Sequence, residues 1–257
     1  MAPSDVEDSD DYYTSSDEYE DVEIPLAPKR RHPASNPKEV HRRMALQCQY
    51  CWKSGEPGVT LLKCGGCRRA VYCSKLCQKN AWKQHKPKCL DAQETRAGLD
   101  TSLLLQRKLL HKFVEKHRPT ILNASYRALD IEAHPERALQ DVLYVRVRRR
   151  PGHPRTETAF YVIDAEVTPI DSFVRAKDQI RECLREGPGG MPVTEDQKKG
   201  IFHGYMVVFT TDHDEISEFI PVAFSTAGER DVYSIGGIKG MSWKDQLVTM
   251  LNEGIVY

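Results

Sequence analysis

The sequence predicts two folded units of different kinds: a small cysteine-rich module, and an α+β domain that follows it. Seven of the eight cysteines fall between positions 48 and 89 of a chain of 257 residues. After residue 91, helical spacing of apolar residues alternates with short β-branched and aromatic runs, which is typical of an α+β domain. The first 28 residues hold ten acidic residues and no Lys or Arg. We therefore expect a disordered tail, acidic and then basic, over residues 1–43, the module over residues 44–91 and the α+β domain over residues 92–257.

The cysteine-rich module contains eight residues that can bind a metal ion. They are Cys48, Cys51, Cys64, Cys67, Cys73, Cys77, His85 and Cys89. Two Cys-x2-Cys pairs suit tight turns around a metal, and two pairs at i, i+4 place both side chains on one helix face. Sulfur-rich sets of four are typical of tetrahedral zinc. Eight ligands predict two zinc ions, although the spacing alone allows either sequential or crossed pairing.

Both predicted zinc ions are expected to be structural. Four protein ligands for each ion leave no open position for water or substrate. A module of about 45 residues with few large apolar side chains cannot fold on its own core. Structural zinc contributes roughly 10–16 kcal/mol of apparent binding energy in small peptides. We therefore expect the module to be unfolded without metal, and we prefer zinc to disulfides because no secretory signal is expected.

The ligand pattern resembles that of a MYND-type zinc finger. The resemblance rests on all eight ligands, on Val71 and Tyr72 before Cys73, and on Gln78 and Trp82 before His85. The gap of twelve residues between Cys51 and Cys64 is longer than is common in the family. The resemblance implies crossed pairing of the ligands. One zinc would be held by Cys48, Cys51, Cys73 and Cys77, and the other by Cys64, Cys67, His85 and Cys89.

The same resemblance implies a function in protein interaction. MYND fingers bind short proline-rich peptides in adaptor and co-repressor complexes, and Gln78 and Trp82 occupy the matching positions for the peptide groove. An aromatic side chain on a rigid scaffold suits such peptides, because an extended proline segment loses little entropy when it docks. Each residue also has an ordinary alternative: Trp82 as part of the small core, and Gln78 as a solvated surface residue.

The charge of the module fits nucleic acid as an alternative partner. Residues 44–91 hold nine Lys/Arg and two Asp/Glu, or +7, and seven thiolates with two Zn²⁺ reduce this to about +4. Positive charge can bind phosphates. The module lacks the layout of the DNA-reading zinc fingers, in which two cysteines and two histidines support a recognition helix, so we favour protein partners over nucleic acid.

The α+β domain is expected to begin with two helices. Thr101 or Ser102 would cap the first, Pro119 would end it, and a second helix would follow. Two strands over residues 142–147 and 159–163 would then form an antiparallel hairpin around the turn at residues 149–155.

The rest of this domain is expected to contain two helices and two strands. The helices cover residues 170–186 and 242–252, and Cys183 lies on the apolar face of the first as a small buried hydrophobic residue. The strands cover residues 205–209 and 219–224.

No catalytic residues are predicted in the α+β domain. Gly236, Gly237 and Gly240 lack the context of a dinucleotide-binding loop and are expected to mark a turn before the last helix. His203 and residues 212–214 form a loose polar cluster, in which residues 212–214 are expected to be a turn. Some MYND-bearing proteins carry a split SET methyltransferase domain around the finger. A finger that starts near residue 48 leaves no room for its first part, and no Asn-His-Ser-like cofactor motif follows. Residues 116–120 and 155–160 resemble the tails of uncharacterised fungal MYND proteins. We expect an interaction protein and keep an enzyme, such as a protein methyltransferase, as the alternative.

The N-terminal tail suggests an intramolecular contact. Residues 24–28, Ile-Pro-Leu-Ala-Pro, resemble the Leu-x-Pro half of a proline-rich ligand beside an acidic stretch. The tail could fold onto the basic module and compete with partners, whereas an untethered acidic tail is the ordinary alternative. No apolar run is long enough for a membrane span, and we expect an intracellular protein of the nucleus or cytoplasm.

Overall fold

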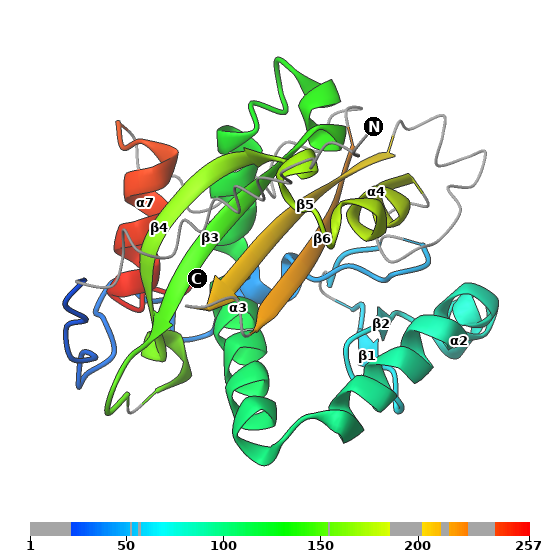
Figure 1. Ribbon diagram of the computed structural model, residues 1–257, viewed down its shortest axis with the longest axis horizontal. Coiled ribbons are helices and arrows are strands. Elements are labelled where there is room, and N and C mark those ends of the chain that lie inside the picture. Colours follow the sequence, from blue (N-terminus) through cyan, green and yellow to red (C-terminus); the bar gives the residue numbers. More distant parts are fainter. Residues whose placement is uncertain are drawn as a thin grey trace, which may run out of the picture.

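The computed structural model describes residues 22–51, 53–55, 58–153, 155–185, 202–211, 216–225 and 240–257. Figure 1 shows a small unit that contains β1, β2 and α2 beside a larger one in which helices pack on a twisted sheet. The smaller unit is called the finger below, and the larger one the C-terminal domain. No helix among the described residues is long and apolar enough to cross a membrane.

The finger combines a small antiparallel pair of strands with one long helix. β1 (Leu62–Lys63) pairs with β2 (Val71–Tyr72). The helix α2 (Lys75–Gly98) begins immediately afterwards. Its N-cap is Ser74, whose Oγ accepts a hydrogen bond from the backbone N–H of Cys77 at 3.1 Å. This cap satisfies one of the free amides of the first turn. The helix also extends past residue 91, the expected end of the module.

The C-terminal domain is built on a four-stranded sheet in the order β4-β3-β5-β6. The strands are β3 (Asp141–Arg149), β4 (Phe160–Pro169), β5 (Phe202–Thr211) and β6 (Ser217–Ser225). The predicted hairpin is confirmed, because β3 and β4 are antiparallel, with a bulge between Arg146 and Val147. The other two predicted strands fall within β5 and β6, which are also antiparallel. β3 and β5 run parallel, so the sheet is mixed. Its strands and the helices that pack on it give the described chain the predicted α+β content.

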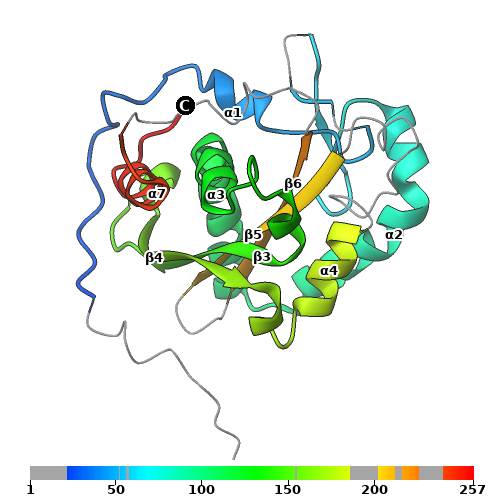
Figure 2. The same ribbon diagram turned by 90° about the horizontal axis from the view of Figure 1, so that it is seen from above.

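Helices cover both faces of this sheet. α3 (Thr101–Ala128) and α7 (Trp243–Asn252) lie on one face (Figure 2). Alternate residues of β3 separate the two sides: Leu143 and Val145 belong to the core under α3. Val142 packs instead with the smaller cluster that includes α4 (Lys177–Arg185) and the 3-10 turn Ile170–Ser172. The predicted helix over residues 170–186 is thus divided into these two parts. Cys183 is half-buried and packs against the smaller cluster.

Pro119 does not end a helix, so the predicted break was wrong. α3 continues through Pro119. A proline inside a helix costs about 3 kcal/mol, because it removes one backbone hydrogen bond and crowds the preceding turn. Phe113 and Val114 before it and Ile121 and Leu122 after it are all at most 4% exposed. Burial of one such side chain contributes about 1.5–3 kcal/mol, so packing on both sides of the proline outweighs the local penalty.

Two helix caps test the expected boundaries. The N-cap of α3 is Asp100, whose Oδ1 accepts hydrogen bonds from the N–H groups of Ser102 and Leu103 at 2.6 and 3.0 Å. Neither of the residues proposed from the sequence takes this role. The helix predicted over residues 242–252 is α7, whose N-cap is Ser242, and the Oγ of Ser242 accepts from the N–H of Asp245 at 3.0 Å.

Residues 22–38, here called the N-terminal strap, precede the finger in the sequence but are hydrogen-bonded to the C-terminal domain. Arg148 Nη1 donates to the carbonyl of Val22 at 3.0 Å. The N–H of Asn36 donates to the carbonyl of Val256 at 2.8 Å, and Ser35 Oγ donates to that of Gly254 at 3.3 Å. The short helix α1 (Val40–Met44) follows. Residues 22–43 therefore differ from the expected disordered tail, because Val22 and Ser35 bond to residues 126 and 219 positions away, which local composition does not reveal.

Some of the sequence predictions lie outside the described residues. These are residues 1–21, residues 212–214, Gly236 and Gly237. Gly240 is described and has a φ of 84° before α7, which fits the expected turn. His203 lies in β5.

Candidate metal centre

Four cysteine side chains, two that precede β1 and two that follow β2, meet in one cluster. Cys48 and Cys51 precede β1, Cys73 directly follows β2, and Cys77 lies in the first turn of α2. The Sγ atom of Cys73 lies 3.5 Å from that of Cys51 and 3.5 Å from that of Cys77. All four Sγ atoms lie within 4.8 Å of one another.

A second cluster is formed by Cys64, Cys67, His85 and Cys89. Their ligand atoms also lie within 4.8 Å of one another, and all four residues are buried. Cys64 Sγ is 3.9 Å from Cys89 Sγ, and Cys67 Sγ is 3.6 Å from His85 Nε2. α2 supplies both His85 and Cys89 from one face, as the i, i+4 spacing predicts.

Both clusters fit zinc. A tetrahedral ion with Zn–S bonds of about 2.3 Å holds its sulfur ligands about 3.8 Å apart. The observed separations of 3.5–3.9 Å match that value and exceed the disulfide length of about 2.05 Å. Every cysteine in the chain is free. Four thiolates in the first cluster, and three thiolates with one imidazole in the second, fill all four positions of each ion, so the two zinc ions are structural.

The geometry groups the ligand pairs in a crossed arrangement. The first pair, Cys48 and Cys51, meets the third pair, Cys73 and Cys77. The second pair, Cys64 and Cys67, meets the fourth pair, His85 and Cys89. The spacing had left sequential pairing open. Crossing joins both halves of the finger through both ions, because each cluster takes one pair from the loops and one pair from the region that includes α2.

The local backbone prepares the second site for its ion. The N–H of Cys64 donates to the carbonyl of Ala70 at 2.8 Å, and its carbonyl accepts from the N–H of Arg68 at 2.9 Å. Arg68 takes a φ of 58°, which closes this turn. Gly66 approaches the metal ligands closely: a Cβ at this position would lie 3.0 Å from Cys89 Sγ. A larger residue at Gly66 would therefore displace a ligand.

Backbone amides favour the thiolate form that zinc requires. Burial raises the pKa of Cys64. Hydrogen bonds from the Cys67 amide, the His85 side chain and the Gly66 amide lower it by more, so the net shift is downward. The pKa of Cys48 is also lowered overall, because amides including that of Cys51 outweigh burial. Burial instead raises the pKa of Cys51, Cys73 and Cys89. Cys48 and Cys64 are therefore the thiols that deprotonate more readily than these three neighbours.

Two supporting side chains lie beyond the expected end of the module. Gln93 Nε2 donates to the carbonyl of Cys89 at 3.1 Å and lies 3.5 Å from its Sγ. Arg96 Nη2 donates to the carbonyl of Cys67 at 2.6 Å. Both belong to the last turns of α2. The signal that could have found Gln93 is its position four residues after a ligand, on the same helix face.

The predicted peptide-binding residues lie one helical turn apart on α2. Gln78 is half-buried, and Trp82 is 43% exposed. The Trp82 ring packs against His85, with 6.1 Å between ring centroids. The buried aromatic residue of the finger is Tyr72, 1% exposed, which meets His85 edge-on at 5.9 Å. Trp82 therefore lies at the surface of the finger, and Tyr72 fills the core position that had been an alternative for it.

The finger contacts the C-terminal domain through charged groups. Glu218 of β6 is 7% exposed. Its Oε1 lies 2.8 Å from His111 Nδ1, and its Oε2 lies 3.5 Å from Arg69 Nη2 of the finger. Burial raises the pKa of Glu218, but the hydrogen bond from His111 and the charges of His111, Arg69 and Arg107 lower it, and the net shift is downward. Arg118 Nε also donates to the carbonyl of Ala45 at 2.9 Å, next to the first ligands.

Comparison with known proteins locates the same unit. Residues 48–89 match the model of the MYND finger family. Mouse histone-lysine N-methyltransferase SMYD3 is 34% identical over 83 residues, which are 32% of this chain and 19% of that protein. MYND-type zinc finger protein samB of Aspergillus clavatus is 49% identical over 54 residues, 20% of this chain and 9% of that protein. Human N-lysine methyltransferase SMYD2 is 45% identical over 42 residues, 16% of this chain and 9% of that protein.

This similarity covers a small part of every protein compared. The chain spans less than a fifth of the length of these curated relatives. No solved structure matches the chain. Ligand geometry and family match nevertheless agree on the same stretch: residues 48–89 of this chain are a MYND finger with two structural zinc ions.

Proposed function

We propose that this chain is a protein-interaction protein whose finger binds short proline-rich segments at Gln78 and Trp82. The observation that carries the proposal is the exposure of Trp82, 43%, on a helix that is fixed by zinc ligands on both sides of it. A large exposed aromatic ring on a rigid helix is a suitable anchor for a peptide. Gln78, one turn earlier, can donate to and accept from the peptide backbone.

The surroundings of Trp82 suit a peptide with acidic residues beside its prolines. Lys75, Lys79 and Lys83 are exposed on the same helix. They add long-range attraction that raises the association rate more than the final affinity. The zinc ions have no free coordination position, so the partner is recognised by the protein surface and not by the metal.

The direct test is a titration of a labelled Pro-x-Leu-x-Pro peptide into the zinc-loaded chain. We expect Trp82→Ala to weaken binding at least tenfold, as loss of an aromatic anchor typically costs about 2 kcal/mol or more, and Gln78→Ala to weaken it less. Leu90, two turns further along α2, is 46% exposed, and Leu90→Ala is the matched control that should bind normally. All three variants should retain two zinc ions by metal analysis. Equal affinities for the wild type and Trp82→Ala would contradict the proposal.

We further propose that the protein acts inside the cell, in the nucleus or the cytoplasm. Seven thiolate ligands are maintained most easily where thiols stay reduced. Direct binding of nucleic acid is less favoured. The exposed lysines on α2 attract any polyanion, so their charge does not indicate a specific nucleic-acid site. A gel shift that is specific in sequence and survives high salt would reverse this preference.

An enzyme in the C-terminal domain is the second candidate. It is favoured by the names of two relatives, which are lysine methyltransferases, although the match to each covers at most 19% of that protein. A thermal-shift titration with S-adenosylmethionine tests it. Clear stabilisation would support a methyltransferase, since a ligand stabilises the state that it binds, and no shift at millimolar cofactor would favour the interaction protein.

A further inference from the structure

Two segments far apart in the sequence build one cationic surface, here called the arginine surface. One segment comprises Arg148 and Arg149 at the end of β3, residues 150–153 and Arg155, and the other is residues 29–31 of the N-terminal strap. Arg155 joins them, because its Nη2 donates a hydrogen bond to the carbonyl of Arg30. Figure 2 shows the strap and α2 at opposite sides of the molecule. The arginine surface is therefore separate from the candidate peptide site on the finger.

This surface has an excess of positive charge. Its Lys and Arg residues are Lys29, Arg30, Arg31, Arg148, Arg149, Arg150 and Arg155. The neighbouring carboxylates are those of Glu23, Glu39, Glu157 and Glu253. Seven cations against four anions leave three positive charges. Within the part of the chain that the structure describes, the exposed side chains of Lys29, Arg30 and Arg149 form no ion pair.

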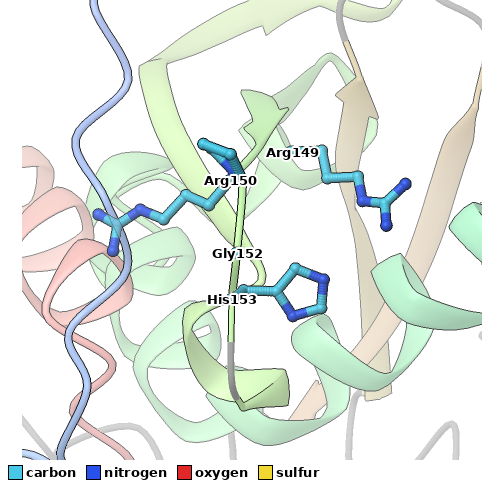
Figure 3. Close-up of a pocket in the computed structure, with 5 residues that line it drawn as sticks. Arg149, Arg150, Gly152 and His153 are labelled. Atoms are coloured by element: carbon cyan, nitrogen blue, oxygen red, sulfur yellow. The ribbon is translucent and has the colours of Figure 1, made fainter.

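Arg150 adds a buried charge to the turn. It is 3% exposed, and its guanidinium lies over the ring of Tyr161 at 4.9 Å. Its Nε and Nη1 atoms have no hydrogen-bond partner among the described residues. Figure 3 shows Arg150 on one side of the turn, and Arg149 with His153 on the other. Together with Pro151 and Gly152 they line an open hollow of about 360 Å³. Glu253 is close enough for its charge to act on Arg150, but Arg150 forms no ion pair with a described carboxylate. Its charge therefore adds to the positive potential of the turn.

We propose that the arginine surface binds the acidic segment formed by residues 1–21 of the same chain. This segment contains nine Asp and Glu residues and no Lys or Arg. It leads directly onto the surface, because Arg148 holds the carbonyl of Val22 at 3.0 Å. Asp21 and Glu20 precede Val22 immediately, and consecutive Cα atoms are about 3.8 Å apart. The nearest carboxylates thus belong to the two residues that precede the contact of Val22 with Arg148.

The tether explains why weak pairs suffice. A single exposed ion pair contributes little, typically no more than about 1 kcal/mol, and a free peptide would bind this surface only weakly. Covalent attachment to Val22 raises the effective concentration of these carboxylates, typically into the millimolar range. The finger is also basic, but the strap fixes residue 22 against the C-terminal domain, which favours the arginine surface over the finger.

The test measures the segment and the surface separately. A fluorescent peptide of residues 1–21 is titrated into a full-length, zinc-loaded chain in which its nine acidic residues are changed to Asn or Gln, so that the surface is unoccupied. We expect saturable binding at low salt, weakened roughly tenfold between about 50 and 300 mM NaCl, as screening predicts. The exposed pair Arg30→Glu and Arg149→Glu should abolish it. The matched reversal on the finger, Lys75→Glu and Lys83→Glu, should leave it unchanged.

Three results would overturn the proposal. The first is the absence of saturable binding at low salt. The second is a loss of binding in the finger variant but not in the arginine-surface variant, which would place the segment on the finger. The third comes from a single-stranded oligodeoxynucleotide. If it binds the wild-type chain as tightly as the chain with the neutralised segment, the surface is open to nucleic acid and is not occupied by residues 1–21. Melting curves establish that each variant is folded.

Discussion

The finger and the C-terminal domain solve the problem of folding in different ways. The buried set of the finger consists largely of its metal ligands, with Tyr72 as its one large buried ring among the described residues. The C-terminal domain instead buries Phe113, Phe160, Tyr205 and Phe209 completely between α3 and the sheet. The finger therefore depends on a ligand that can be removed, and the C-terminal domain depends on apolar surface that cannot.

This difference also separates shape from function. A core of ligands leaves Trp82 of α2 available at the surface, whereas α3 of the C-terminal domain buries the ring of Phe113. Where zinc supplies the stability, few apolar residues are needed inside, and an aromatic residue can be used for recognition.

Removal of zinc should give the largest difference in stability between the finger and the C-terminal domain. We expect a chelator to unfold the finger and leave the C-terminal domain folded, because structural zinc supplies roughly 10–16 kcal/mol in modules of this size. Amide exchange reports both regions in one sample. Protection in α2 should disappear, while protection in α3 and β3 remains. A uniform loss of protection would show that the C-terminal domain depends on the finger.

The reverse experiment is a substitution in the apolar core of the C-terminal domain. Phe113 is 0% exposed and packs against Phe160 at 5.5 Å between ring centroids, so Phe113→Ala should destabilise the C-terminal domain by about 3–5 kcal/mol. Leu105 lies on the same helix and is 61% exposed, and Leu105→Ala is the control, with less than about 0.5 kcal/mol expected. Urea unfolding gives both values, and metal analysis should still find two zinc ions. Loss of zinc in Phe113→Ala would mean that the two regions fold as one unit.

The two regions should also respond differently to acid. His117 is 0% exposed, and its Nε2 lies 2.9 Å from the carbonyl of Glu157. Burial lowers the pKa of His117 from 6.5 to about 4. Between those values the unfolded chain binds a proton that the folded chain does not, so the contribution of His117 to stability is complete above pH 6.5 and falls as the pH approaches 4. The loss should approach about 3 kcal/mol.

Substitution isolates this histidine. In His117→Gln, the part of the pH dependence that falls between pH 6.5 and 4 should disappear, as followed by amide exchange of α3 and β3. His134→Gln is the control at an exposed position, with a side chain that is 56% exposed, and should keep the wild-type pH profile. An unchanged profile in His117→Gln would assign the effect to another group.

The contact between the regions should give the smallest effect. Glu218→Gln removes the charge that faces Arg69 and His111, and we expect a coupling of about 1 kcal/mol with Arg69→Ala in a double-mutant cycle, because Arg69 is partly exposed and screened. Asp171→Asn, in the exposed pair with Arg181, should cause no measurable change in urea unfolding. A coupling of zero would mean that the finger is held mainly by other contacts, such as Arg118 with Ala45.

The sequence predicted the finger better than the domain that follows it. Metal ligands must recur at fixed spacings, so the two zinc sites were visible in the cysteines and His85. Their crossed grouping was implied by the family resemblance but not by the spacing, since residues such as Cys51 and Cys73 are brought together only by the fold. In the C-terminal domain the hairpin and the last helix follow from local chemistry. The continuity of α3 through Pro119 does not, because it depends on apolar contacts with distant strands. The strap was missed for the same reason, as Ser35 bonds to Gly254.

The central claim is that crossed ligation holds the finger in shape. Cadmium-113 can replace zinc at tetrahedral thiolate sites, and a cadmium–proton correlation spectrum of the full chain identifies which ligands share an ion. We expect one resonance coupled to the β-protons of Cys48, Cys51, Cys73 and Cys77. A second resonance should couple to those of Cys64, Cys67 and Cys89 and to the ring of His85. A resonance that links Cys48 and Cys51 to Cys64 and Cys67 would contradict it.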